Sequence, residues 1–272
     1  MVVSFALSFG VSLVPENVFL KIEGLSKYFE GVRAVDGINL SLKKGEVTSL
    51  IGPNGAGKTT FFNCITGMVA PSAGDIYFQK KMISGLKPFQ ITARGVARTF
   101  QNIRLFSEMT VLENVLVGRY TKSAFSIKQT FMGALRQGKK FKQGETETRE
   151  VAMDLLAFVG LSAQSERPAR HLAYGDQRRL EIARAMASDP QLLLLDEPAA
   201  GMNPRETHAL MDLVGKIQKR GITPFLIEHN MQLVMGVSDQ IVVLDHGTKI
   251  AQGSPKEIQK DKAVIAAYLG GA

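Results

Sequence analysis

The sequence predicts an α/β fold with a mixed, largely parallel core sheet. An apolar strand at 47–51 runs into a glycine-rich loop and then a helix, and a second apolar strand at 192–195 ends in two adjacent carboxylates. The helix that follows Pro204 leads to a further strand at 223–227. This β-α-β alternation implies strands that pair in parallel, with helices across the faces of the sheet.

Composition limits the class of protein without selecting one. The 272 residues are enough for one large α/β domain, and the 45% hydrophobic content is ordinary for a globular core. A single cysteine, Cys64, cannot form an internal disulfide, which fits a reducing compartment. The formal charge of +8 suits nucleic acid or an anionic membrane surface equally well.

No stretch has the roughly 20 consecutive apolar residues of a transmembrane helix. Residues 1–14 are apolar and serine-rich but carry no Lys or Arg, so they lack the charged start of a signal peptide. We expect a disordered N-terminal extension here; a membrane-touching arm is the alternative.

Local patterning predicts the other elements. Residues 18–22 and 38–42 alternate like strands, and 74–78 have the pattern of another. The helix after the glycine-rich loop is expected to end at Gly67, a natural C′ residue. Helical periodicity dominates from about 110 to 161. Its apolar faces are made by Val111, Leu112, Val115 and Leu116, and then by Val151, Leu155, Leu156 and Val159.

The C-terminal part predicts a hairpin and a last helix. Residues 241–251 have the pattern of a hairpin that turns near Gly247. Ser254 to Glu257 form a capping box with Pro255 at the first helical position, so a helix is expected to start there. The chain is therefore expected to fold as one domain over 15–272, an α/β core with a helical insertion at about 102–170.

Residues 52–59, Gly-Pro-Asn-Gly-Ala-Gly-Lys-Thr, match the phosphate-binding P-loop pattern in full, between an apolar strand and a helix. Glycines let backbone N–H groups close around phosphate oxygens, and the helix N-terminus adds positive potential. Lys58 is expected to reach the β- and γ-phosphates, and the Thr59 hydroxyl to bind Mg²⁺. The nucleotide-binding residues expected here are Gly52, Asn54, Gly55, Ala56, Gly57, Lys58, Thr59 and Thr60.

The apolar strand at 192–195 ends in Asp196 and Glu197. A carboxylate at this position can reach magnesium directly or through water, which is the role expected for Asp196. Glu197 can polarise the attacking water as general base. The alternative is two acids that merely cap a loop.

Residues 171–179 resemble the signature loop of ATP-binding cassette (ABC) ATPases, whose usual form is Leu-Ser-Gly-Gly-Gln. The corresponding residues are Leu172, Ala173, Tyr174, Gly175 and Asp176, and the helix that follows resembles the family's signature helix throughout. In that family this loop faces the γ-phosphate held by the other subunit's P-loop. Ala173 lacks the serine hydroxyl, and Asp176 places an acid where an amide is usual; a first-turn acid favoured by the helix dipole is the simpler explanation for Asp176.

The resemblance implies further roles. Phe29 corresponds to the aromatic that stacks on adenine, with Tyr28 or plain core packing as alternatives. Gln101 corresponds to the glutamine that contacts the metal, beside Thr59 and Asp196. Asn203 stands where the family's D-loop usually has Asp, and His229 matches the switch histidine at the γ-phosphate. No role is assigned to the remaining histidines, which are His171, His208 and His246.

The tracts around Gln101, the signature, Glu197 and His229 resemble the ATP-binding subunit of branched-chain amino acid importers. That resemblance implies an ABC ATPase fold with an antiparallel β subdomain, and ATP and Mg²⁺ as cofactors. It also implies two transmembrane permease subunits, a second ATP-binding subunit, identical or different, and an extracytoplasmic solute-binding protein. The chain would then lie peripherally on the cytoplasmic face of the cell membrane. Urea or amide importers, and more distantly the lipopolysaccharide-export ATPase, share these tracts.

Other readings of the sequence fit less well. A non-transport ABC protein acting on nucleic acid would carry a long coiled coil between Lys58 and Leu172, or a second cassette, and neither is present. A module that holds ATP without hydrolysing it would not need Glu197 and His229. The basic segment 119–149 is expected to be a solvated helical hairpin. Anionic lipid or a membrane partner is its functional alternative, and nothing predicts a specific nucleic-acid partner.

Overall fold

The structure is a computed structural model that describes residues 18–120 and 138–269. Its core is a six-stranded sheet in the order β10-β9-β3-β8-β7-β6. Every neighbouring pair from β9 to β6 is parallel, and β10 joins β9 antiparallel, so the predicted mixed sheet is confirmed. The strands are β3 (Thr48–Ile51), β6 (Val96–Arg98), β7 (Leu192–Asp196), β8 (Thr223–Ile227), β9 (Gln240–Asp245) and β10 (Thr248–Gly253).

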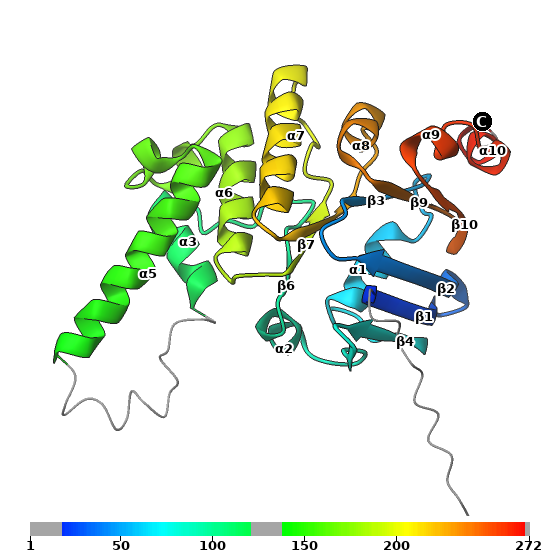
Figure 1. Cartoon of the computed structure of the whole chain (residues 1–272), viewed down its shortest axis with the longest axis horizontal. Helices are drawn as coiled ribbons and strands as arrows, with labels where there is room; N and C mark the ends of the chain where they lie inside the picture. The colour runs from blue at the N-terminus through cyan, green and yellow to red at the C-terminus, as the bar shows by residue number, and fades with distance from the viewer. Residues whose placement is uncertain (1–17, 121–137, 270–272) are drawn as a thin grey trace, which may run out of the picture.

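The central strands are buried on both faces, as expected for parallel strands sandwiched between layers. Alternate leucines of β7 belong to different cores. Leu193 and Leu195 pack with the residues of α7 (Pro204–Lys219), whereas Leu192 and Leu194 pack with α1 (Lys58–Ile65). Figure 1 shows α7 and α8 (Met231–Val237) above this sheet, and α1 on its other side.

An antiparallel sheet covers α1 from outside, in the order β2-β1-β4-β5. It comprises β1 (Val18–Phe29), β2 (Val32–Lys43), β4 (Ala73–Phe78) and β5 (Lys81–Met82). The first two strands run well beyond the 18–22 and 38–42 stretches predicted from alternation, because hairpin pairing continues to Phe29 and Val32 through several register shifts. The sequence did not predict β5, β6 or the short helix α2 (Pro88–Ala93).

A group of helices stands at the opposite end of the molecule from the four-stranded sheet (Figure 1). It contains α3 (Val111–Arg119), α5 (Gly138–Val159) and α6 (Tyr174–Met186), and two short 3₁₀ turns at Ser162–Gln164 and Ala169–His171 lie between α5 and α6. A capping box starts α3: Glu113 N donates to Thr110 Oγ1 (3.1 Å) and Thr110 N to a Glu113 carboxylate oxygen (2.7 Å). The apolar faces predicted for 111–116 and 151–159 lie in one core.

The C-terminal hairpin turns between Asp245 and Thr248, as predicted. The helix that begins after Ser254, α9 (Pro255–Ile258), ends after about one turn. A separate helix, α10 (Lys262–Leu269), follows it, because the Asp261 carboxylate accepts from Ala263 N (2.8 Å) and Val264 N (3.1 Å) and starts a new helix.

Within 18–120 and 138–269, none of the helices combines the length and hydropathy that a membrane crossing requires. The predicted extension at 1–14 lies outside the described residues, as do residues 121–137 of the basic segment 119–149.

Candidate active site

The loop that follows β3 places its glycines in backbone conformations that residues with side chains rarely adopt. Gly52, Gly55 and Gly57 have φ of 151°, 82° and 95°, in the region that favours glycine. A Cβ on Gly52 would lie 2.1 Å from the Leu244 carbonyl oxygen, and one on Gly57 would lie 2.1 Å from that of Ala34. Gly57 caps α1 without a side-chain hydrogen bond, so the first N–H groups of the helix are free to meet an anion.

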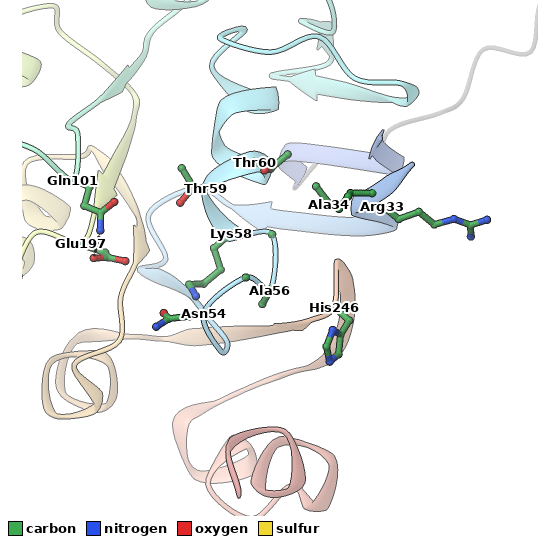
Figure 2. A pocket seen from close by; sticks show the side chains of 13 residues that line it. Arg33, Ala34, Asn54, Ala56, Lys58, Thr59, Thr60, Gln101, Glu197 and His246 are labelled. Carbon is green, nitrogen blue, oxygen red and sulfur yellow. Dashed lines mark hydrogen bonds between the residues drawn. The ribbon is translucent and has the colours of Figure 1, made fainter. Parts of the chain in front are cut away.

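Lys58 is folded over this loop. Its Nζ donates to the carbonyl oxygens of Gly52 (2.7 Å) and Pro53 (2.9 Å), and the residue is only 8% exposed. Burial lowers the pKa of Lys58, while the charges of Glu197 and Asp196 act in the opposite direction. The ammonium group therefore lies at the loop, where two carbonyl oxygens accept its hydrogen bonds (Figure 2). Phosphate oxygens are also acceptors, so they could take the place of these carbonyls.

A cavity of about 470 Å³ opens over the loop. Of the predicted nucleotide-binding residues, the continuous stretch 54–60 lines it, whereas Gly52 and Phe29 are not part of the lining. Gln101 and Glu197 close one side, as Figure 2 shows. The lining from outside the predicted set is Val32, Arg33, Ala34 and His246.

Glu197, Gln101 and His229 converge beside the cavity from three separate segments. Gln101 Nε2 donates to Glu197 Oε2 (2.8 Å), and His229 Nδ1 lies 3.8 Å from the same oxygen. Glu197 has φ 46°, a left-handed backbone that is uncommon for a residue with a side chain. Its N–H donates to the Ile227 carbonyl at the end of β8 (2.9 Å), which fixes this conformation. Strain held in this way is often found at functional sites.

Asp196, the last residue of β7, is 2% exposed and does not line the cavity. Arg98 Nη2 donates to its Oδ2 (2.6 Å), so one carboxylate oxygen is engaged by a buried guanidinium. Thr59, Gln101 and Asp196 together offer hydroxyl, amide and carboxylate oxygens, the ligands that Mg²⁺ prefers. In the described part of the chain no group of three or more His, Cys, Asp or Glu residues could hold a metal. The donor set therefore fits an ion that arrives with phosphate oxygens, and not a metal held by protein alone.

The signature residues lie away from the cavity, on the start of α6. Leu172 is buried, Ala173 is the N-cap and Tyr174 the first helical residue. A Cβ on Gly175 would lie 2.8 Å from Glu206 Oε1. The Asp176 carboxylate accepts from Gln164 Nε2 (3.0 Å) and from Arg179. Within one chain the structure does not bring this loop to the P-loop.

The remaining predicted residues have local structural partners. Asn203 caps α7, because its Oδ1 accepts from Glu206 N (3.0 Å). Phe29 is 42% exposed, with Lys27 Nζ 4.8 Å from its ring centroid. The alternative aromatic, Tyr28, donates its hydroxyl to Asp36 (2.8 Å).

His246, to which the sequence assigned no role, stands at the cavity on the tip of the β9–β10 hairpin (Figure 2). His246 and Gly247 have φ of 44° and 78°, as in a two-residue turn. Backbone bonds hold this tip beside the P-loop: Gly247 N donates to the Ala56 carbonyl (3.2 Å), and Asp36 N to that of Gly247 (2.8 Å). Sequence patterning predicted the turn but carries no signal for its position against the loop.

Comparison with known proteins identifies the family. Residues 35–200 match the family model described as ABC transporter, and 248–272 match one described as branched-chain amino acid ATP-binding cassette transporter. The chain belongs to the ABC transporter family. This ABC ATPase is 46% identical over 254 residues to the high-affinity branched-chain amino acid transport ATP-binding proteins LivG of Salmonella typhimurium and BraF of Pseudomonas aeruginosa, covering 93% of this chain and 98% of each relative.

Solved structures agree with the fold of the ABC ATPase. A crystal structure of an ABC transporter cassette in its ADP conformation matches with a TM-score of 0.80 at 34% identity, over 93% of this chain and 99% of that one. A nucleotide-free cassette matches with a TM-score of 0.79 at 33% identity, over 92% and 98% of the two chains. The chain is therefore an ATP-hydrolysing enzyme, and the cavity over the P-loop is its candidate nucleotide site.

Proposed function

We propose that this ABC ATPase drives the uptake of branched-chain amino acids through partner permeases. The observation that carries the proposal is the 46% identity to LivG and BraF over 98% of their length, since both are transport ATP-binding proteins for these amino acids. The C-terminal match at 248–272 points to the same branch of the family. In this proposal the transported amino acid does not contact this chain, so its identity is inferred from the similarity to LivG and BraF alone.

In the proposed reaction, residues 54–60 hold the triphosphate of ATP, and Lys58 exchanges its loop carbonyls for phosphate oxygens. Thr59, Gln101 and Asp196 would hold Mg²⁺, which neutralises phosphate charge when bound. Glu197 acts as general base on the attacking water. Gln101 holds that carboxylate by a 2.8 Å hydrogen bond, and His229 stands beside it. Leu172 to Asp176 contact the ATP that is bound to the P-loop of a second ATP-binding subunit.

A second cavity supports the permease contact. It measures about 410 Å³ and lies between α2, the loop after Gln101, and the ends of α3 and α6. Phe106 and Val117 are exposed there. Arg104 stacks on Phe100 and Arg184 on Phe106. Glu181 also lines the cavity, and its charge acts on Arg184. An apolar groove with two such guanidinium groups fits a cytoplasmic permease helix that carries apolar side chains and a carboxylate. Such docking would keep the ATPase at the cytoplasmic membrane face, with an extracytoplasmic binding protein supplying the cargo.

Uptake measurements test the cargo. Cells that lack this chain are expected to lose uptake of labelled leucine, isoleucine and valine, and the wild-type chain is expected to restore it. Glu197→Gln should not restore uptake, because the amide cannot accept the proton of the attacking water. Glu166→Gln is the matched control, since Glu166 is an exposed acid whose ion-pair partner within the described residues is the exposed Arg149. Unchanged leucine uptake with loss of urea or amide uptake would contradict the proposed cargo.

Purified protein tests the chemistry separately. Glu197→Gln should lower ATP turnover by at least about 10²-fold, the lower end of what a general base contributes. Binding of ATP should persist, because the P-loop is unchanged. Turnover close to that of the wild type would remove Glu197 from the role of base.

A further inference from the structure

A buried ion pair on α6 holds the backbone of the segment that carries Gln101. Arg178 Nη1 lies 3.3 Å from Glu181 Oε2, and the two side chains are 3% and 2% exposed. Burial raises the pKa of Glu181, against the Phe100 N–H hydrogen bond and the charge of Arg178, which lower it. Removing both charges from water costs free energy that the pair recovers only if further hydrogen bonds satisfy both groups. The hydrogen-bond partners of this pair therefore show what it holds in place.

Those partners are mainly backbone groups of the segment after β6. Arg178 donates to the Phe100 carbonyl (2.8 Å) and to the Gln101 carbonyl, and Phe100 N donates to Glu181 Oε1 (3.3 Å). Strand pairing ends just before this point, and in the described structure residues 100–105 donate or accept no backbone–backbone hydrogen bond. The ion pair thus replaces the neighbouring strand that this segment lacks.

The same guanidinium also reaches the signature loop. Arg178 Nη2 donates to the Tyr174 hydroxyl (3.0 Å), and the group lies 5.5 Å from the centroid of that ring. The Tyr174 ring in turn lies against Gly201, where an added Cβ would come within 3.2 Å of a ring carbon. One planar group therefore bonds Gln101 on one side and a signature residue on the other, which a lysine ammonium could not do in the same geometry.

We propose that Arg178, supported by Glu181, couples this chain's own nucleotide site to its signature loop. The coupling rests on the proposed function, because it starts at Gln101, whose side chain holds Glu197. In the proposed coupling, Gln101 shifts when nucleotide and metal bind. The guanidinium of Arg178 follows because it is bonded to the Gln101 carbonyl, and Tyr174 follows because its hydroxyl is bonded to the same guanidinium. The signature loop, which serves the other subunit's ATP, then responds to the occupancy of this chain's own site. Arg178 is a positioning residue and touches no reacting atom.

Hydrogen exchange on the full chain tests the coupling. The probe is a non-hydrolysable ATP analogue with Mg²⁺, added at a protein concentration at which light scattering reports a monomer, so that no second chain covers the signature loop. In the wild type, nucleotide should slow amide exchange at 52–60 and 99–106 and alter it at 172–178. We expect a change of about tenfold at 172–178, corresponding to about 1.4 kcal/mol.

Two variants break the connection at different points. Arg178→Lys keeps the positive charge beside Glu181 but loses the planar guanidinium that bonds Gln101 and Tyr174 together. Tyr174→Phe removes only the hydrogen bond between Arg178 and the hydroxyl of this half-exposed ring. In both, the nucleotide response at 52–60 should persist while the response at 172–178 is lost. Arg149→Gln, which opens the exposed pair between α5 and Glu166, is the control and should respond like the wild type. Should Arg178→Lys fail to fold, Tyr174→Phe carries the test.

The outcomes separate the two proposals. A wild-type chain without any response at 52–60 would overturn the proposed nucleotide site and the coupling with it. A response at 52–60 without one at 172–178 in the wild type would overturn the coupling alone. So would variants that keep the wild-type response at 172–178, since the ion pair would then only stabilise the fold.

Discussion

Asp176 occupies the third position of α6, where the helix dipole favours a carboxylate. That placement agrees with the simpler explanation of this residue as a first-turn acid, and the structure adds two side-chain partners. Gln164 and Arg179 both donate to the carboxylate, and Arg179 also donates to the Val159 carbonyl (3.0 Å). The acid therefore ties the signature helix to the end of α5.

The pH dependence of stability tests this tie. Burial acts to raise the pKa of Asp176, but hydrogen bonds from Gln164 and Arg179 and the charge of Arg179 bring it below its ordinary value of 3.8. A carboxyl with a lowered folded-state pKa stabilises the fold above the unfolded value, and loses this contribution as pH falls through the folded value.

Asp176→Asn should therefore lower the free energy of unfolding by about 1 kcal/mol at neutral pH, a modest effect because water reaches Arg179. The difference from the wild type should shrink below pH 3.8. Denaturant titrations at several pH values measure it, and a difference that does not depend on pH would contradict the account.

Three secondary-structure elements meet at one side chain, that of Arg98. It leaves the end of β6, bonds Asp196 at the end of β7, and donates to Asn63 Oδ1 (2.7 Å) on α1 and to Oγ1 of its C-cap residue, Thr66 (3.2 Å). The pair with Asp196 is almost fully buried. The helix that carries Lys58 is thereby fixed against the strand that carries Asp196.

Arg98→Met should be strongly destabilising, because it leaves Asp196 buried without its partner. The expected loss is about 3–5 kcal/mol in the free energy of unfolding, measured by denaturant titration. Arg149→Gln opens an exposed pair and should cost at most about 1 kcal/mol. Equal losses in the two variants would show that the Arg98 pair does not join the elements as described.

Elements could be predicted from the sequence where local patterns are strong. The apolar strands β3, β7 and β8, the P-loop helix and the β9–β10 hairpin follow from residues close together in the chain. Short β5 and β6 could not, because a two- or three-residue strand is defined by its neighbour and not by its own residues. Sequence patterning predicted one C-terminal helix and missed the second. The break between α9 and α10 depends on the Asp261 side chain, which caps α10 by accepting from Ala263 N.

The same limit applies to the site. The P-loop and the Asp196–Glu197 pair form contiguous motifs and were predicted by residue. Arg33 and His246 reach the cavity only because the β1–β2 and β9–β10 hairpins meet at the loop. The partners of Arg98 and Arg178 are likewise distant in sequence, and no pattern in the chain connects them.

At the scale of the whole molecule, one chain presents two proposed functional surfaces that do not meet. The cavity over the P-loop lies at Lys58, and none of the signature residues 172–176 lines it. In a two-ATPase assembly each site would join one chain's P-loop to the other's signature. Ala173 and Asp176 would then weaken only the site on the partner's P-loop.

Separate substitutions in an assembly with a different second ATPase test this asymmetry. Lys58→Ala in this chain should remove the stronger site and cause the larger loss of turnover. Alanine at the partner's P-loop lysine should remove the weaker site and cause the smaller loss. Steady-state ATPase rates of the two singly substituted assemblies measure the difference, and equal losses would count against it.

The left-handed backbone at Glu197 has a consequence for how this protein can be improved. A residue with a side chain pays about 1–2 kcal/mol to stand there, whereas glycine does not. Glycine at 197 would relax the chain and remove the proposed catalytic carboxylate in the same step. A selection for thermal stability alone would therefore favour variants that are more stable but do not hydrolyse ATP. Engineering of a more stable form of this ATPase has to keep Glu197 unchanged.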